Sequence, residues 1–207
     1  MILIDAVQGS AEWLAARVGV ITASRAKDAC KMLKNGDPAE VAIAYAAQIA
    51  LERVSGVRCD ETFVNAAMRR GTELEPQARA AYEADTGILV LESGIVLTDD
   101  RVFGYSTDGL IGSDGLLEIK CPSSPRVVCS MWRDGDVSEY MHQIQMGLWI
   151  TGRKWLDFVM YDPRLSCVGK SLFVKRIDRD ETFIEQLEVG LMRCAKLTDD
   201  FATALQK

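Results

Sequence analysis

Three charged residues near the middle of the chain have types and spacing that could carry chemistry. Segment 116–121 is apolar apart from Glu118 and Lys120, and it lies between a glycine-rich turn and a proline. This pattern predicts a β-strand of a hairpin. Side chains two positions apart on a strand point to the same face, about 6–7 Å from each other. Glu118 and Lys120 therefore share a surface, and Asp108 precedes them on the neighbouring predicted strand.

Two carboxylates beside an ammonium group suit the hydrolysis of a phosphodiester. Mg²⁺ prefers oxygen ligands and is commonly held by one or two carboxylates together with water and substrate phosphate. A nearby lysine can orient the attacking water and offset negative charge on the phosphate. The pattern predicts a metal-dependent phosphodiesterase. The alternative is a polar hairpin in which Glu118 and Lys120 form an ion pair on a solvated sheet.

The composition bounds the class of protein. A chain of 207 residues with 48% hydrophobic and 26% charged residues is expected to form a single domain, residues 1–207, with a large core. The sequence has no apolar run of about 20 residues and no basic and apolar leader at its start. A cytoplasmic protein is expected.

Cysteine and histidine usage argues against the common metal centres built on those residues. The chain has six cysteines without a CxxC pair, and one histidine, His142. Zinc and iron–sulfur sites are not expected, and the cysteines are predicted to be reduced and mostly buried. The net charge of −6 argues mildly against nucleic acid. Basic residues nevertheless gather in segments 17–34, 69–70 and 126–133.

The first part of the chain is predicted to be helical. Ser10 is suited to cap a helix 11–17, and a second helix is expected from Thr22 or Ser24 to residue 33. Hydroxyls and amides at a helix start suit an anion, and Arg17 lies just upstream. A terminal phosphate could bind here. The alternative is that Ser24 only caps the helix and Arg17 is solvated.

Two longer helices are expected next. Asp37 is predicted to cap a helix 38–54 through a capping box, and a helical pattern from 63 to 86 is expected to be interrupted at 69–71. Glu75 lies one turn from Arg79 in that second pattern. It could bind a metal or a water, or form an ordinary surface pair with Arg79.

The remaining segments alternate between strands and helices. Gln143 lies on one stripe of a predicted helix with Tyr140 and Gly147, and could present its amide to a water or a phosphate. The expected fold class is α/β (α+β) with a central mixed β-sheet flanked by helices. Strands are predicted at 88–98, 101–106, 155–161 and 171–177, and helices at 126–132, 138–151 and 179–205.

Several separated blocks, in this order, resemble the phage lambda-type exonucleases, the YqaJ-like viral recombinase nucleases of the PD-(D/E)xK superfamily. The similarity covers about residues 13–163. The blocks are Trp13-x-x-x-Arg17 with Gly19-Val-Ile-Thr-Ala-Ser24, Gly71-x-x-x-Glu75-x-x-Ala-Arg79, Ser106-Thr-Asp-Gly109, Leu117-Glu-Ile-Lys-Cys-Pro122, Tyr140-Met-x-Gln143-x-Gln145 with Trp149-x-Thr151, and Tyr161-Asp-Pro-Arg164.

The resemblance implies a restriction-endonuclease-like core and a set of catalytic residues. Asp108, Glu118 and the carbonyl of Ile119 would hold a catalytic Mg²⁺. Glu75 would serve a second ion or its water shell. Lys120 would orient and activate the nucleophile, and Gln143 would support this arrangement.

The resemblance also implies how DNA would bind. Arg17, Ser24 and Ser106 match a pocket for the 5′-phosphate of the recessed strand, and Met68 falls where the family places an apolar wedge. Thr107 departs from the superfamily pattern, which has proline there; this residue shapes the approach to Asp108 and is not a ligand.

The implied activity is two-metal, Mg²⁺-dependent 5′ to 3′ digestion of one strand of linear double-stranded DNA, with Mn²⁺ able to substitute. The product would be a 3′ single-stranded overhang for recombination by strand annealing. Family resemblance further implies a phage or prophage protein, a ring-shaped homotrimer and a single-strand annealing protein as partner. Two alternatives stay open. They are a structure-specific or restriction-type endonuclease on the same core, and a non-catalytic DNA-binding recombination scaffold.

Overall fold

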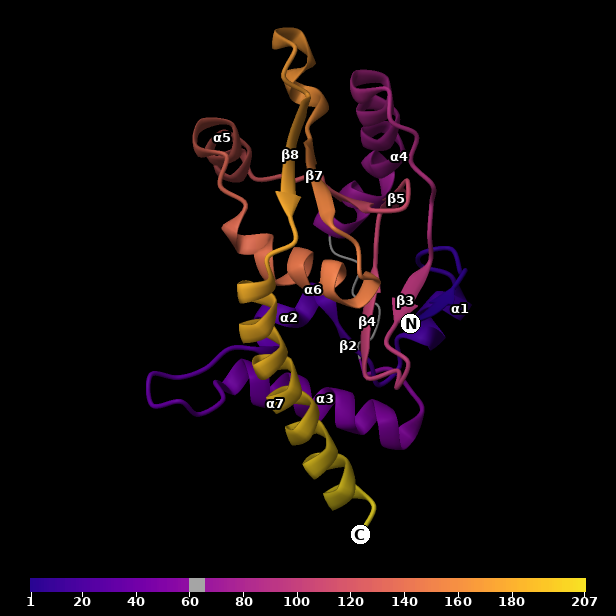
Figure 1. Ribbon diagram of the computed structural model, residues 1–207, viewed down its shortest axis with the longest axis vertical. Helices are drawn as coiled ribbons and strands as arrows, with labels where there is room; N and C mark the ends of the chain where they lie inside the picture. Colours follow the sequence, from indigo (N-terminus) through magenta and orange to yellow (C-terminus); the bar gives the residue numbers. More distant parts are fainter. Residues whose placement is uncertain (60–65) are drawn as a thin grey trace.

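The computed structural model of the chain describes residues 1–59 and 66–207, and of residues 66–68 it describes the helical backbone but not the side chains. The elements form an α/β structure in which two mixed sheets are flanked by helices (Figure 1). The predicted fold class is confirmed. None of the described helices combines the length and apolar content that a membrane span requires.

The two sheets each contain four described strands. The strands are β1 (Ile2–Ile4), β2 (Ile21–Thr22), β3 (Ile95–Leu97), β4 (Phe103–Ser106), β5 (Gly109–Ile111), β6 (Gly115–Lys120), β7 (Trp155–Tyr161) and β8 (Leu172–Asp178). The first sheet has the order β1-β3-β4-β2 and the second β5-β6-β7-β8. Strands β2 and β4 are parallel, as are β6 and β7, and the other neighbours are antiparallel. The predicted hairpin is therefore β5-β6.

Helices cover the sheets and cross below them (Figure 1). The described helices are α1 (Ala11–Ala16), α2 (Ala26–Ala29), α3 (Glu40–Ser55), α4 (Ala66–Thr86), α5 (Pro125–Asp134), α6 (Met141–Thr151) and α7 (Glu181–Leu205), with 3-10 turns η1 (Ala23–Arg25), η2 (Ser138–Tyr140) and η3 (Pro163–Val168). Ser10 caps α1 as predicted, because its hydroxyl accepts a hydrogen bond from the backbone N–H of Trp13 (3.2 Å).

The predicted capping box before α3 is wrong. The N-cap residue of α3 is Ala39, and the helix begins at Glu40. Asp37 instead accepts a hydrogen bond from the Asn35 side chain (Nδ2–Oδ2 2.7 Å), and its carbonyl accepts one from the N–H of Leu33. These bonds close a local turn, so Asp37 serves the turn instead of the helix. The helix predicted to reach residue 33 is also shorter than expected, since α2 stops at Ala29.

Helix α4 runs through the predicted interruption at 69–71 without a break. An interior glycine costs roughly 1 kcal/mol relative to alanine, and α4 offsets that cost by tertiary packing. Ala78 and Tyr82 are fully buried against the second sheet. The Tyr82 hydroxyl donates to Asp157 of β7 (2.6 Å), which also pairs with Arg176. The start predicted at residue 63 lies outside the described residues.

Strand β6 separates two packed layers. Leu117 and Ile119 face α4 with Ala78, on the side opposite Glu118 as the alternating pattern predicted. Leu116 faces the larger core that includes α6. Glu118 therefore points toward α6 and lies almost fully buried, with 2% of its surface exposed. The charged residues of β6 are thus placed between the sheet and α6.

All six cysteines have free thiols, in agreement with the predicted reduced state. The expectation that most are buried is wrong for half of them, since Cys59, Cys129 and Cys167 are exposed.

Candidate active site

Glu118 is the centre of a hydrogen-bonded group on the α6 side of the second sheet. Lys120 Nζ and Gln143 Nε2 each lie 2.6 Å from Glu118 Oε1, and Tyr105 Oη lies 3.0 Å from Oε2. The predicted proximity of Glu118 and Lys120 is thus confirmed, and α6 delivers Gln143 to the same carboxylate. These donors fix a buried carboxylate that strand β6 alone could not satisfy.

Asp108 lies between β4 and β5, at the edge of β6. Its Oδ2 accepts a hydrogen bond from the N–H of Ile119 (2.6 Å), and its own N–H donates to the carbonyl of Leu117 (3.2 Å). Thr107 is buried, and its Oγ1 lies within hydrogen-bond distance of the carbonyl oxygens of Gly109 (2.8 Å) and Leu117 (3.0 Å). The threonine hydroxyl thus fixes the backbone directly before Asp108.

The pKa values of the site reflect the close approach of the Asp108 and Glu118 carboxylates to Lys120. Burial, and then the negative charge of Glu118, raise the pKa of Asp108 well above its ordinary value. Burial alone would lower the pKa of Lys120, but the Glu118 and Asp108 carboxylates outweigh it and raise this pKa. Lys120 is therefore a protonated hydrogen-bond donor at neutral pH.

Glu75 approaches from α4 and pairs with Arg79. Arg79 Nη2 donates to Glu75 Oε1 (2.6 Å) and to the carbonyl of Asp108 (3.1 Å). Burial raises the pKa of Glu75, and Arg79 opposes that change. Glu75 is thus brought to Asp108 through Arg79, and the surface pair considered from sequence is also present.

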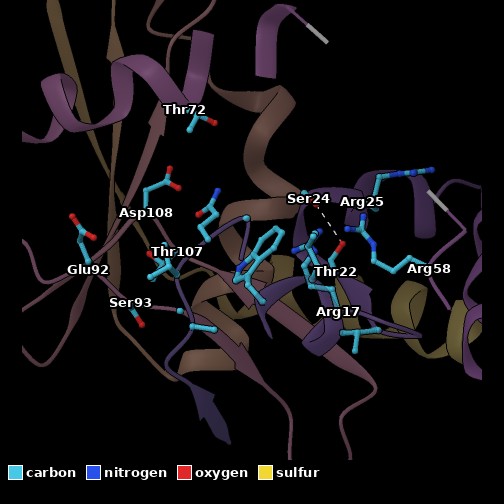
Figure 2. A pocket seen from close by; sticks show the side chains of 18 of the residues that line it. Arg17, Thr22, Ser24, Arg25, Arg58, Thr72, Glu92, Ser93, Thr107 and Asp108 are labelled. Carbon is cyan, nitrogen blue, oxygen red and sulfur yellow. Dashed lines mark hydrogen bonds between the residues drawn. The ribbon is translucent and has the colours of Figure 1, made fainter. Parts of the chain in front are cut away.

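A cavity of about 930 Å³ connects Asp108 and Glu75 to a basic region. Figure 2 shows Thr72, Thr107, Asp108 and Glu92 on one side of it and Arg17, Ser24, Arg25 and Arg58 on the other. The Arg25 guanidinium carbon lies 4.6 Å from the ring centre of Tyr45. One end of the cavity can therefore attract an anion while the other carries the acids.

Two of the three residues predicted to hold a terminal phosphate, Arg17 and Ser106, contact Trp13. The Arg17 guanidinium lies over the Trp13 ring (4.4 Å), and Trp13 Nε1 donates to Ser106 Oγ (3.0 Å). Ser24 Oγ lies 3.3 Å from Thr22 Oγ1. Arg17 and Ser24 line the cavity, whereas Ser106 supports Trp13 in its wall.

Sequence reasoning missed Tyr105, Arg25 and Arg58. Arg25 directly follows Ser24, so proximity in sequence was a usable signal for it. No sequence signal marked Tyr105, because it comes from β4 and reaches Glu118 only in the folded structure. The Met68 side chain lies outside the described residues.

The donor set fits a hard divalent cation. Asp108 and Glu118 supply carboxylate oxygens, and the backbone N–H of Ile119, the residue after Glu118, donates to Asp108. Since burial and mutual repulsion raise the pKa of Asp108, a bound cation would stabilise its charged form. Within the described residues, no group of three or more His, Cys, Asp and Glu side chains is arranged to hold a metal. Two carboxylates suffice for Mg²⁺ when water and phosphate complete its shell.

Comparison with known proteins identifies the family. The profile of the YqaJ-like viral recombinase domain matches residues 12–154. This chain belongs to the YqaJ-like viral recombinase family. A comparison with curated protein sequences found no significant match.

Solved structures of similar proteins agree with this family. An alkaline exonuclease from Laribacter hongkongensis, LHK-Exo, is 38% identical, with a TM-score of 0.83 over 95% of this chain and 97% of that chain. A structure of LHK-Exo in complex with dAMP gives the same values. A phage-related exonuclease from Haemophilus somnus 129PT, 16% identical, shares the fold with a TM-score of 0.70 over 90% of this chain and 96% of that chain.

Proposed function

We propose that this YqaJ-like protein is a divalent-metal-dependent exonuclease that digests one strand of linear double-stranded DNA from its 5′ end. The observation that carries the proposal is that one continuous cavity joins an acidic end containing Asp108 to a basic end containing Arg17. A nuclease needs the first group, and an enzyme that starts at a phosphorylated terminus needs the second. The 38% identity to a protein described as an alkaline exonuclease supports the same reaction.

The residues around Asp108 would have distinct roles in metal binding and hydrolysis. Asp108, Glu118 and the Ile119 carbonyl would hold one Mg²⁺ or Mn²⁺ ion, and Glu75 a second ion or its water shell. When bound, these ions supply Lewis acidity toward the phosphodiester and the attacking water. Lys120 donates hydrogen bonds toward the water and the phosphate oxygens. Gln143 keeps Glu118 in position.

The basic end of the cavity would set the polarity of digestion. Arg17 offers a planar fork that suits phosphate oxygens, and Ser24 adds a hydroxyl. A 5′-phosphate held there would extend its strand toward Asp108, so hydrolysis would proceed 5′ to 3′ and leave a 3′ single strand. A homotrimeric ring and transfer of that strand to an annealing protein complete the proposal, and both rest on family resemblance.

The activity is tested with purified protein and linear duplex DNA in the presence of Mg²⁺, Mn²⁺ or EDTA. We expect acid-soluble nucleotides with either metal and none with EDTA. No release under any condition, together with retained DNA binding, would favour a non-catalytic recombination scaffold.

A further inference from the structure

A buried carboxylate beside the site just described holds two arginines. Asp162 follows the last residue of β7 and has 1% of its surface exposed. Arg164 contacts it with Nε (2.8 Å and 3.0 Å) and Nη2 (2.5 Å). Arg70 of α4 contacts it once, through Nη2 at 3.3 Å. The cluster carries two positive charges against one negative charge.

The two arginines are satisfied to different degrees. Arg164 matches both Asp162 oxygens and also donates to the Ser123 carbonyl (3.4 Å). Arg70 has one long hydrogen bond, and its Nε is buried with no acceptor among the described residues. A buried donor without an acceptor is destabilising, and Asp162 has little remaining capacity to help. The Arg70 side chain nevertheless stays 27% exposed and the Arg164 side chain 49% exposed, so part of each guanidinium-bearing side chain remains open to an added anion.

The cluster lies beside the catalytic end of the second sheet. Lys120 is opposite Met160 in the parallel β6-β7 pair, so Asp162 lies about level with Pro122, just past the catalytic lysine. Two positions along α4 from Arg70, Thr72 lines the cavity. Neither Arg70 nor Arg164 is among the described residues that line it, so they form a separate basic group from Arg17 and Ser24.

We propose that Arg70 and Arg164, oriented by Asp162, bind an internal phosphodiester of the DNA backbone, away from the 5′ terminus. The fork of a guanidinium matches phosphate oxygens, and a fixed carboxylate behind it keeps that fork oriented. An internal phosphate fits better than a terminal one because the cavity already provides a separate basic end. The identity of the ligand as DNA rests on the proposed function.

The test is binding of a fluorescent duplex with 5′-hydroxyl ends, measured by anisotropy in EDTA over a range of salt concentrations. For Arg70→Gln we expect weaker binding, and a slope of log K against log salt that is reduced by about one phosphate contact. Arg70→Lys should keep the slope and lose part of the affinity, since it keeps the charge but not the fork. Arg193→Gln, the same change at an exposed position of α7, serves as the matched control and should behave as wild type.

Wild-type affinity and slope for Arg70→Gln, at an unchanged melting temperature, would overturn the proposal. Should Arg70→Gln unfold, Arg70→Lys carries the test, and wild-type affinity for it would overturn the proposal. An effect seen only with 5′-phosphorylated duplex would assign Arg70 to the terminal pocket and also overturn it. Failure of the wild type to digest DNA would defeat the proposed function alone, because the binding assay needs no hydrolysis.

Discussion

The hydroxyl of Tyr105 donates a hydrogen bond to Glu118 across the junction of the two sheets, with 3.0 Å between Oη and Oε2. Tyr105 belongs to β4 of the first sheet and Glu118 to β6 of the second. Both side chains are buried, and Gly147 of α6 leaves the space that the tyrosine ring occupies. The position of the proposed metal-binding carboxylate therefore depends on how the two sheets and α6 meet.

Tyr105→Phe tests that dependence, because it keeps the ring and removes only the hydroxyl. A hydrogen bond to a charged group contributes about 1.5–3 kcal/mol, so we expect kcat to fall roughly tenfold or more with KM little changed. Tyr82→Phe is the matched control, since it removes a similar bond to the buried Asp157 outside the cavity. It should lower the melting temperature and leave kcat nearly unchanged. Equal kcat values for the two variants would contradict the role given to Tyr105.

Lys120→Ala separates binding from turnover. The raised pKa of Lys120 keeps it protonated at neutral pH, so its expected role is that of a fixed donor near the phosphate. Removing such a donor costs roughly 10²–10³-fold in kcat. Single-turnover rates and duplex affinity should be measured together, and we expect only the rate to fall. A near-normal rate would remove Lys120 from the mechanism.

Arg17→Ala addresses the choice of DNA end. We expect kcat/KM on 5′-phosphorylated duplex to fall by about 10-fold to 100-fold, the size of a charge-assisted hydrogen bond. The rate on 5′-hydroxyl duplex should stay the same. Arg193→Ala is a control that should change neither rate. An unaltered ratio between the two substrates would refute the assignment of Arg17 to the phosphate pocket.

Gly147→Ala probes the fit between α6 and the first sheet. The added methyl would lie 2.7 Å from two atoms of the Tyr105 ring, so the ring or the helix must move. Such overpacking costs about 1–3 kcal/mol, and we expect loss of both stability and activity. Gly71→Ala on α4 meets nothing within 4 Å and should be stabilising. Urea unfolding of both variants gives the comparison, and a Gly147→Ala protein as stable as wild type would contradict the packing argument.

The hairpin that carries Glu118 and Lys120 could be predicted because its local signals agree. A glycine turn precedes it, apolar residues alternate with charged ones, and Pro122 follows it. Strand alternation alone then placed Leu117 and Ile119 on the face opposite the charged pair, as the structure confirms.

Elsewhere the local signals competed with tertiary packing or with each other. Asp37 has the residue type of a helix cap but completes a turn with Asn35 instead. Gly71 looked like a helix break, yet burial of Tyr82 further along α4 keeps the helix intact. Tyr105 could not be assigned from sequence, because its contact with Glu118 depends on the meeting of two separate sheets.

The net charge was a weak guide to nucleic-acid binding, because it does not show where the charges lie. The total of −6 describes the whole chain, whereas Arg17, Arg25 and Arg58 are concentrated at one end of one cavity. Local distribution, which requires the fold, decides whether a phosphate can bind.

The most direct test of the account compares Mg²⁺-dependent nucleotide release from three substrates of the same sequence. They are a linear duplex with 5′-phosphate ends, a linear duplex with 5′-hydroxyl ends and a covalently closed circle. The account predicts fast digestion of the phosphorylated linear duplex, slower digestion of the hydroxyl form and no cutting of the circle. Cutting of the circle would contradict it and identify an endonuclease on the same core.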